Sequence, residues 1–570
     1  MLAMTSLAAA EPPSRDTRPD TWAATDALNR RVDPAVYPAA KPNRFVGVFY
    51  FLWMQGGSKD RVFDITKVLA NNSASPAWGP VNAFHWWGEP YFGYYRSDDT
   101  YVIERHAQQL SDAGVDVVVF DVTNALTYDD TLLKLCETFE RLRKQGRQTP
   151  QIAFLAHSKS AKTITHLYET FYAPGRYADL WFRWRGKPLM MGPSTDLDAK
   201  VTNFFTMRDS WAWTSPEGWF KDGHDKWPWL SRTPQHFGWT DSPKKPEQIP
   251  VAVSEHPVTP IGRSFHDGHQ PAQKDVKSEQ GIYFAEQWKR ALEVDPEFVF
   301  ITGWNEWIAQ RTLAKPVGSP KVLGYQTLKP GDTYFVDTYS QEFSRDIEPM
   351  KGGHGDAYYY QMVDGIRRFK GVRPLPAVSQ PRTIDLNAGF GQWADVTPSY
   401  FDDLHDADPR DSQGYGDAGR LKNDTGRNDI DTTRVTSDAT TVYFYVRTRE
   451  RLTPPADANW MTLLVRTAGR GWGGYDLAVN RTAPRDGQTA VERVIDGKRG
   501  QKAGDAKIRY AGNELQVAVP RALIAGTAGR PLRFEFKWVD NGPVGGDPIG
   551  FIDQGDTAPN GRFNYRYAER

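Results

Sequence analysis

The sequence has almost no cysteine, no net charge and no long hydrophobic run. Cys136 is the single cysteine among 570 residues, which excludes an intramolecular disulfide and a zinc site of four cysteines. The 70 lysines and arginines are balanced by 70 aspartates and glutamates, so the clustered positive charge of a nucleic-acid-binding surface is not expected. No apolar run approaches the roughly 18 residues of a membrane-spanning helix. We therefore expect neither a nucleic-acid partner nor a membrane span.

Aromatic side chains are abundant in this otherwise polar chain. It has 20 Trp, 25 Tyr and 29 Phe, which together make 13% of the residues. Trp and Tyr combine a flat apolar face with a polar edge. Sugar rings stack their C–H faces on such side chains, while their hydroxyls form hydrogen bonds. The composition therefore favours a polysaccharide or oligosaccharide as the partner.

The sequence divides into a lead-in, two domains and a linker. Met1–Glu11 (MLAMTSLAAAE) resembles the tail of a signal peptide with a small-residue cleavage site, which predicts a secreted or periplasmic protein. The predicted units are a signal remnant and extended lead-in at 1–43, a first domain at 44–373, a proline-rich linker at 374–381 and a second domain at 382–570.

Short apolar runs alternate with helical periodicity throughout the first domain. The predicted strands are 45–53, 115–121, 151–156, 188–191, 249–254 and 298–303, and the predicted helices are 99–113, 127–146, 160–172 and 278–293. This alternation is typical of a parallel α/β sheet, and its length favours a closed (β/α)8 TIM barrel. Between 194 and 250 the strands cannot be counted. In the second domain, strands at 442–447, 460–465, 515–519 and 532–538 predict an all-β sandwich.

Carboxylates follow several of the predicted barrel strands. Asp121, Glu255 and Glu306 stand at strand ends, and Glu89 lies in the loop after the first strand. Loops at these ends converge on one cleft in a parallel barrel. Glycosidic cleavage needs an acid that protonates the leaving oxygen and a base or nucleophile on the other side. We predict Glu306 as base or nucleophile and Glu255 as general acid, with Asp121 and Glu89 as further candidates.

Aromatic, histidine and amide side chains surround these carboxylates in the sequence. The predicted substrate-binding residues are Trp53, His85, Trp86, Trp87, Tyr91, Asn124, His157, His256, Trp304, Asn305, Trp307 and His354. The tryptophans would line the sugar subsites. His354 belongs to a polar stretch with Glu348 and Lys351, which either lines the substrate or closes the barrel. The histidines lack the spacing of a metal motif, so neither a catalytic metal nor a required cofactor is predicted.

Three segments occur in a characteristic order: Gly88–His106 (GEPYFGYYRSDDTYVIERH), Arg183–Met190 (RWRGKPLM) and Gly281–Trp307, which ends in FVFITGWNEW. They resemble glycoside hydrolase family 99 and the related family 71-like barrels, the endo-mannosidase group. The resemblance implies a glycosidase, endo-acting, on a TIM barrel. In that family the Asn-Glu-Trp motif continues into His-Glu, and the two glutamates act as a base assisting the sugar 2-hydroxyl and as the general acid.

The resemblance breaks beside Glu306. Ala309 stands where the family has its second glutamate, and the family's acidic segment after the third strand is here Ala156–Lys159. Glu306 therefore carries over, but the mannosidase specificity and mechanism do not. Two alternatives stay open: a non-catalytic glycan-binding protein on a decayed barrel, and a polysaccharide lyase in which His or Tyr and Lys act on a uronic acid.

The second domain contains segments such as Trp393–Val396 (WADV) and Gly555–Tyr565 (GDTAPNGRFNY). They resemble a family 9 carbohydrate-binding module. The resemblance implies that glycan could lie between aromatic side chains, with Trp460, Trp472 and Trp538 as candidates and core packing as the alternative for each. An aspartate cluster, Asp406, Asp408 and Asp411, could hold a structural Ca²⁺ through oxygen ligands.

Overall fold

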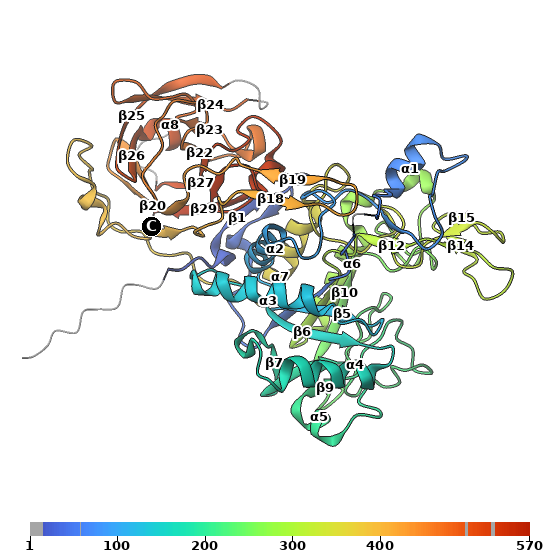
Figure 1. Cartoon of the computed structure of the whole chain (residues 1–570). Coiled ribbons are helices and arrows are strands. Elements are labelled where there is room, and N and C mark those ends of the chain that lie inside the picture. Colours follow the sequence, from blue (N-terminus) through green and yellow to red (C-terminus); the bar gives the residue numbers. More distant parts are fainter. Residues whose placement is uncertain (1–14, 58, 496–499, 526–530, 570) are drawn as a thin grey trace, which may run out of the picture.

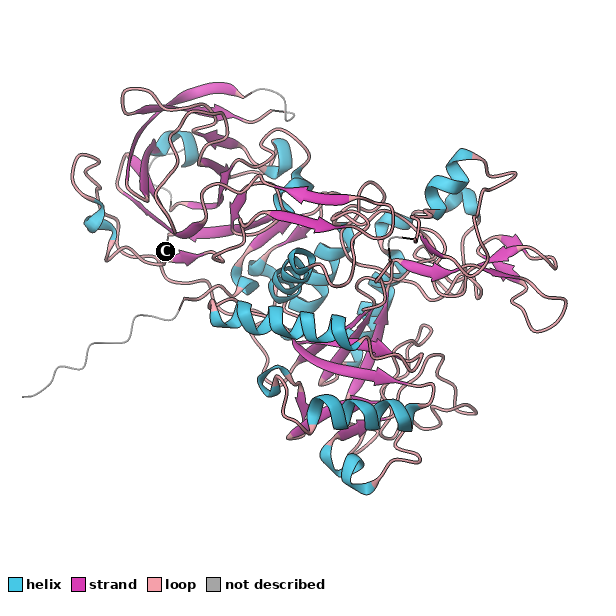
Figure 2. Ribbon diagram, viewed as in Figure 1, coloured by secondary structure: helices cyan, strands magenta, loops and turns pink. Residues whose placement is uncertain are grey.

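The computed structural model describes residues 15–57, 59–495, 500–525 and 531–569 (Figure 1). The predicted signal segment Met1–Glu11 lies outside these ranges. A parallel sheet with helices forms the first part of the chain, and a large antiparallel sheet forms the second (Figure 2). Within the described ranges, no helix has both the length and the hydropathy to span a bilayer.

Seven parallel strands form the sheet of the first domain. They are β3 (Phe45–Tyr50), β5 (Val117–Val122), β6 (Gln151–Ala156), β8 (Lys187–Met191), β9 (Thr206–Arg208), β10 (Gln248–Ala252) and β11 (Phe298–Thr302). They pair in the order β10-β11-β3-β5-β6-β8-β9, and short β7 (Arg183–Trp184) pairs antiparallel with β8. All six predicted strands are confirmed. β9 lies in the stretch where the sequence showed no countable strand.

The sheet is curled, with a buried cluster on its inner face. Alternate strand residues contribute to this cluster, including Phe49, Val119, Leu155, Met191 and Phe300, because successive side chains on a strand point to opposite faces. In the described pairings β9 and β10 are not joined; residues 209–247 run between them, and Gly238 in this segment bridges to Gln248 of β10. A curled α/β sheet is thus confirmed, and closure into eight strands stays a prediction.

Helices cover the outer face of the curled sheet. They are α2 (Thr100–Ala113), α3 (Asp129–Lys144), α4 (Ser160–Leu167), α5 (Ala199–Phe204), α6 (Ile282–Val294) and α7 (Ala357–Lys370). A further helix, α1 (Ile65–Asn71), lies apart from the sheet, and its Ile65 belongs to the buried cluster that contains Trp86 and Trp87. The boundaries of α2 follow from its sequence. The Asp99 carboxylate accepts a hydrogen bond from the Tyr101 N–H, and Gly114 ends the helix in the left-handed conformation with φ 89°.

The second domain is built on one continuous antiparallel sheet. Its main strands are β17 (Tyr400–Phe401), β20 (Ile430–Ser437), β21 (Thr441–Thr448), β22 (Thr462–Arg466), β23 (Leu477–Val479), β24 (Gln488–Arg493), β25 (Gln501–Ala511), β26 (Glu514–Pro520), β27 (Arg533–Asp540), β28 (Asp556–Ala558) and β29 (Phe563–Ala568). The four predicted strands are confirmed, and the division into two sheets of a sandwich stays a prediction.

The lead-in is part of this second sheet. β1 (Ala23–Thr25) pairs antiparallel with β29 and with β2 (Arg31–Val32). The sequence predicted an extended segment there, and nothing in it indicated the pairing, because three residues carry no periodicity. The N-terminal segment thus crosses the first domain to reach the last strand of the chain.

Polar contacts join the two domains. A hairpin of β18 (Arg410–Gln413) and β19 (Arg420–Asn423) reaches from the second domain toward α2 (Figure 1). Arg410 Nη2 donates to Asp99 Oδ2 at 2.6 Å, and both side chains are buried. Asn560 Nδ2 donates to Asp112 Oδ2 at 3.0 Å. The N-cap carboxylate of α2 is therefore also a domain contact.

Arg410→Met should loosen this domain contact. The change removes a charged hydrogen bond to the Asp99 carboxylate. That carboxylate still accepts a hydrogen bond from Ser412 Oγ at 2.6 Å. We therefore expect the free energy of unfolding to fall by about 2 kcal/mol. Thermal unfolding and the rate of proteolysis in the 374–381 linker measure it. Arg420→Met on the same hairpin is the control, because Arg420 pairs with exposed Asp411. Equal behaviour of the two variants would contradict the prediction.

Candidate active site

An arginine gathers carboxylates at the carboxyl end of the parallel sheet. Glu306 follows β11, and Arg345 comes from the segment before α7. Arg345 Nη2 and Nε donate to Glu306 Oε2 at 2.5 and 3.0 Å, and the two side chains are only 2% and 3% exposed. Arg345 Nη1 donates to the backbone oxygen of Glu255 at 2.6 Å, after β10. The ends of two strands are thereby tied to one guanidinium.

Asp337 is the half-buried carboxylate of this group, and it is the one with the most access to solvent. Its side chain is 42% exposed, and its Oδ1 lies 3.8 Å from Arg345 Nη2. Glu306 Oε2 contacts the same nitrogen at 2.5 Å. The Asp337 and Glu306 oxygens therefore lie at most 6.3 Å apart. His256 Nε2 lies 3.4 Å from Asp337 Oδ1. Burial acts to raise the pKa of Asp337, but the His256 hydrogen bond and the Arg345 charge outweigh it and lower the pKa below its usual value.

Asp121 has the opposite environment. It ends β5, is 7% exposed, and accepts a hydrogen bond from the Thr123 N–H at 2.9 Å. Burial raises its pKa to about 6, the Thr123 hydrogen bond acts against this, and the charge of Asp337 adds to the rise. Two aspartates that influence each other thus have pKa values shifted in opposite directions, a pattern associated with acid and base assignments.

Glu306 itself is deeply buried. Burial raises its pKa well above the usual value, the Arg345 charge opposes this rise, and the charge of Asp346 adds to it. The Glu306 N–H donates to Asp346 Oδ1, and the Trp87 indole donates to Asp346 Oδ2 at 2.5 Å. Asp346 therefore fixes the Glu306 backbone and Arg345 fixes its side chain. In this conformation the Glu306 carboxylate is paired with Arg345 and does not contact solvent.

The Glu255 and Glu89 carboxylates have partners other than Arg345. The Glu255 carboxylate accepts from Tyr283 Oη at 2.8 Å and lies 3.4 Å from Arg232 Nε. Glu89 pairs with Lys67 at 2.6 Å and Lys351 at 2.7 Å. It lines a separate cavity of about 760 Å³ between α1 and the 339–353 segment. The sequence predicted Glu255 at a strand end and Glu89 in the loop after the first strand, but it could not show the partners of their side chains.

Four predicted sugar platforms are core residues. Trp86, Trp87, Trp304 and Trp307 are all 0% exposed. Trp87 stacks on Trp307 with ring centres 4.7 Å apart, and Trp307 Nε1 donates to Glu348 Oε2 at 2.5 Å. Burial leaves no ring face for a sugar, which corrects the sequence interpretation. The same rings fill the space behind the strand ends.

Several other predicted residues have structural partners. Asn305 exchanges hydrogen bonds with the backbone of Phe51, tying β11 to β3. Both ring nitrogens of buried His85 contact backbone oxygens, and Tyr91 donates to Asp553 of the second domain at 2.8 Å. Buried His354 packs against Trp87. These four residues contact protein groups rather than the carboxylate group around Arg345.

The remaining predicted residues lie at the mouth of the curled sheet. His157 is exposed and stacks on Trp211 with ring centres 3.5 Å apart, Asn124 is exposed after β5, and Trp53 is half-buried against Phe51. Sequence reasoning missed Asp337 and Arg345, and it missed three tryptophans: Trp211, Trp213 and Trp229. Asp337 and Arg345 lie shortly before Glu348, Lys351 and His354 in the sequence, and the polar stretch around those residues was the available signal.

Comparisons with known proteins give low similarity. No protein-family model matches the chain, and neither does any curated protein. Among solved structures, the GH99 endo-α-mannosidase from Bacteroides thetaiotaomicron is 13% identical, with 58% of this chain and 98% of that chain covered and a TM-score of 0.31. The same enzyme in complex with bis-tris-propane is 12% identical, with 57% of this chain and 97% of that chain covered and a TM-score of 0.30. A glycoside hydrolase-like protein is 11% identical, with 58% of this chain and 95% of that chain covered and a TM-score of 0.29. Similarity of this size establishes neither family nor activity, so the function rests on the site.

Proposed function

We propose that the protein is a glycoside hydrolase that cleaves a polysaccharide or oligosaccharide at the carboxyl end of the parallel sheet. The observation that carries the proposal is the arrangement in which Arg345 contacts both Glu306 and Asp337 while the charge of Asp337 acts on Asp121. Glycosidic cleavage with two carboxyl groups needs one acid and one base or nucleophile in the same site, and Asp121 and Asp337 are the two proposed here.

The three carboxylates take different roles in this proposal. Asp337 is half-buried, and its lowered pKa keeps it ionised, so it acts as base or nucleophile. Asp121 keeps its proton up to about pH 6 and acts as the general acid. Glu306 fixes Arg345, which orients Asp337, and so it is a positioning residue. These roles differ from the sequence hypothesis, in which Glu306 was the base or nucleophile and Glu255 the acid.

An exposed tryptophan next to this group would hold the sugar. Trp213 is 37% exposed and its ring lies 5.4 Å from that of His256. Buried Trp229 supports Arg345, with its ring 5.6 Å from the guanidinium carbon, and half-buried Trp211 packs on Trp229 with ring centres 6.1 Å apart. An aromatic ring beside carboxylates suits the binding of a sugar ring within a longer glycan chain, and we therefore propose endo action.

The pH dependence of catalysis should reflect Asp121. Its carboxyl group donates a proton only while protonated, so kcat/KM should fall as the pH rises through about 6. The measurement is a pH profile of the wild type. Asp121→Asn should lack this alkaline limb when tested on an aryl glycoside whose leaving group needs no proton. If kcat/KM of Asp121→Asn still falls above about pH 6, a group other than Asp121 is responsible for the fall.

A panel of polysaccharides tests the activity itself. We expect new reducing ends, and oligosaccharide products of several lengths from endo cleavage. A second candidate, glycan binding without cleavage, is favoured by one observation: Glu306 is 2% exposed and paired with Arg345, and Ala309 stands where a second glutamate would be. Binding without new reducing ends would support that candidate. Absorbance from a new C=C bond would instead indicate a lyase.

A further inference from the structure

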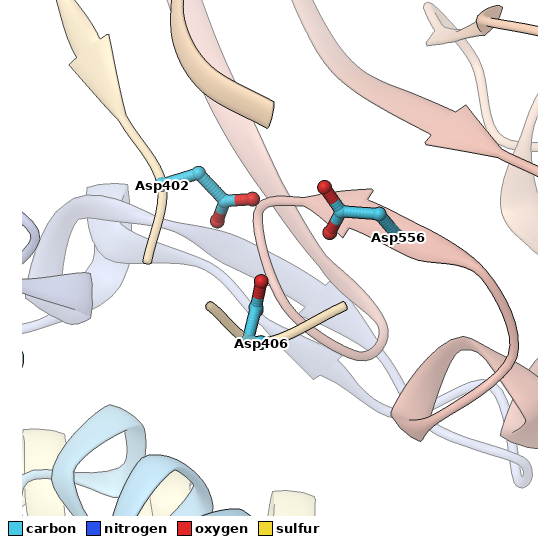
Figure 3. A group of neighbouring side chains, drawn as sticks. All are labelled: Asp402, Asp406 and Asp556. Carbon is cyan, nitrogen blue, oxygen red and sulfur yellow. The ribbon is translucent and has the colours of Figure 1, made fainter. Parts of the chain in front are cut away.

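Three aspartates converge where the second domain meets α2 (Figure 3). Asp402 follows β17, Asp406 lies in the next loop, and Asp556 begins β28. One carboxylate oxygen from each lies within 4.8 Å of the others, and the residues are 1%, 6% and 3% exposed. Figure 3 shows the three carboxylates turned toward a common point. Segments about 150 residues apart in sequence thus place three acids around one buried space.

Several carboxylate oxygens of the three aspartates have no hydrogen-bond partner. Gln108 Nε2 of α2 donates to Asp406 Oδ2 at 2.8 Å, and the Ile430 N–H donates to Asp556 Oδ2 at 2.5 Å. Asp406 Oδ1 and both oxygens of Asp402 have no hydrogen-bond partner. Because a buried polar atom without a partner costs free energy, a native structure normally satisfies it with protein, water or an ion.

Lys537, a buried lysine whose charge acts on Asp402, does not satisfy these oxygens. Lys537 is 0% exposed, and its ammonium donates to the Pro559 backbone oxygen. Burial lowers the pKa of Lys537 to about 7, so it is only partly charged near neutral pH. Within the described part of the chain, no ion pair joins Lys537 to any of the three aspartates.

We propose that Asp402, Asp406 and Asp556 form a binding site for a hard divalent cation of the size of Ca²⁺. All three donors are carboxylate oxygens, the ligands that such cations prefer. Oxygens at about 2.3–2.6 Å from Ca²⁺ lie up to about 5 Å from each other, which accommodates the observed spacing. Of the three aspartates that the sequence suggested as Ca²⁺ ligands, only Asp406 belongs to this site. The side chains of the other two, Asp408 and Asp411, are 57% and 54% exposed.

A cation at this site would connect the domains. Asp402 and Asp556 belong to the second sheet, whereas Asp406 is fixed to α2 by Gln108 and by the Arg105 guanidinium, which donates to the Asp406 backbone oxygen. Binding would neutralise three carboxylates that otherwise repel one another at the joint. The cation therefore stabilises the folded two-domain chain and takes no part in the carboxylate group around Arg345.

The experiment uses the full chain after removal of metal by chelation. Calorimetric titration with CaCl2 should show one site, and about 1 mM Ca²⁺ should raise the Tm by about 5 °C over the chelated protein. Asp402→Asn should abolish both the heat of binding and the Tm increment. The chelated variant should itself melt higher than the chelated wild type, because a buried carboxylate without a partner has been removed.

Asp408→Asn is the matched control and should keep the full Ca²⁺ response. Mg²⁺ in place of Ca²⁺ tests the size of the site, and we expect a smaller increment because Mg²⁺ requires shorter oxygen distances, about 2.0–2.1 Å. No binding to the wild type, or a response that Asp402→Asn leaves intact, overturns the proposal. Because the readouts are binding heat and Tm, neither depends on whether the protein cleaves a glycan.

Discussion

Asp337→Asn should lower kcat on the natural glycan by about 10³-fold or more while the Tm stays nearly unchanged. The carboxylate is 42% exposed, so an amide of equal size fits without a packing defect. What the variant loses is the ionised oxygen next to Arg345 and His256 that serves as base or nucleophile. Initial rates and binding of the same oligosaccharide, measured together, give kcat separately from affinity, and we expect affinity to persist.

Asp332→Asn is the matched control for this variant. Asp332 lies on the same segment, and its carboxylate caps a turn by accepting from the Lys329 N–H at 2.7 Å, a bond that asparagine can also accept. Its kcat should equal that of the wild type. Full activity of Asp337→Asn would remove Asp337 from the mechanism and leave Asp121 without a partner carboxylate.

Arg345→Met should destabilise the first domain by about 3–5 kcal/mol, because it leaves buried Glu306 without its counter-charge. The variant also loses the donor to the Glu255 backbone oxygen. Thermal unfolding should show the loss, and it should be smaller at about pH 5 than at about pH 8, since protonation of Glu306 removes the uncompensated charge.

Glu306→Gln in the Arg345→Met background separates charge from packing. The double variant should recover a large part of the lost stability, because no buried ion remains, yet its kcat should stay low because Asp337 has lost its orienting guanidinium. Equal stability of the single and double variants would show that Glu306 does not depend on Arg345. Recovery of activity in the double variant would contradict the positioning role.

Local periodicity accounts for what the sequence predicted about the fold. Continuous apolar runs such as Phe45–Tyr50 and Val117–Val122 are typical of strands buried on both faces, and the Asp99 cap with Gly114 bounds α2. β9 has three residues and β1 has three, too few for any pattern to emerge. Pairing between β1 and β29 depends on partners more than 500 residues apart, which no local signal encodes.

The candidate site was predictable only in part for a related reason. Strand boundaries indicated that Asp121, Glu255 and Glu306 would stand at one end of the sheet, and they do. The directions of their side chains were not predictable: Glu255 turns to Tyr283, and Glu306 turns to Arg345. Tryptophans next to the carboxylates suggested sugar platforms, but those rings fill the core.

The sequence by itself determined the alternation of strands and helices, the division into an α/β and a β part, and the strand ends that carry carboxylates. Those features follow from composition and spacing along a short stretch of chain. The tertiary structure alone decided which acids meet: Asp337 beside Glu306 on Arg345, and Asp402, Asp406 and Asp556 around one buried space. The physical reason is that a carboxylate's pKa and partners depend on burial and on charges brought close by folding, and neither is written in neighbouring residues.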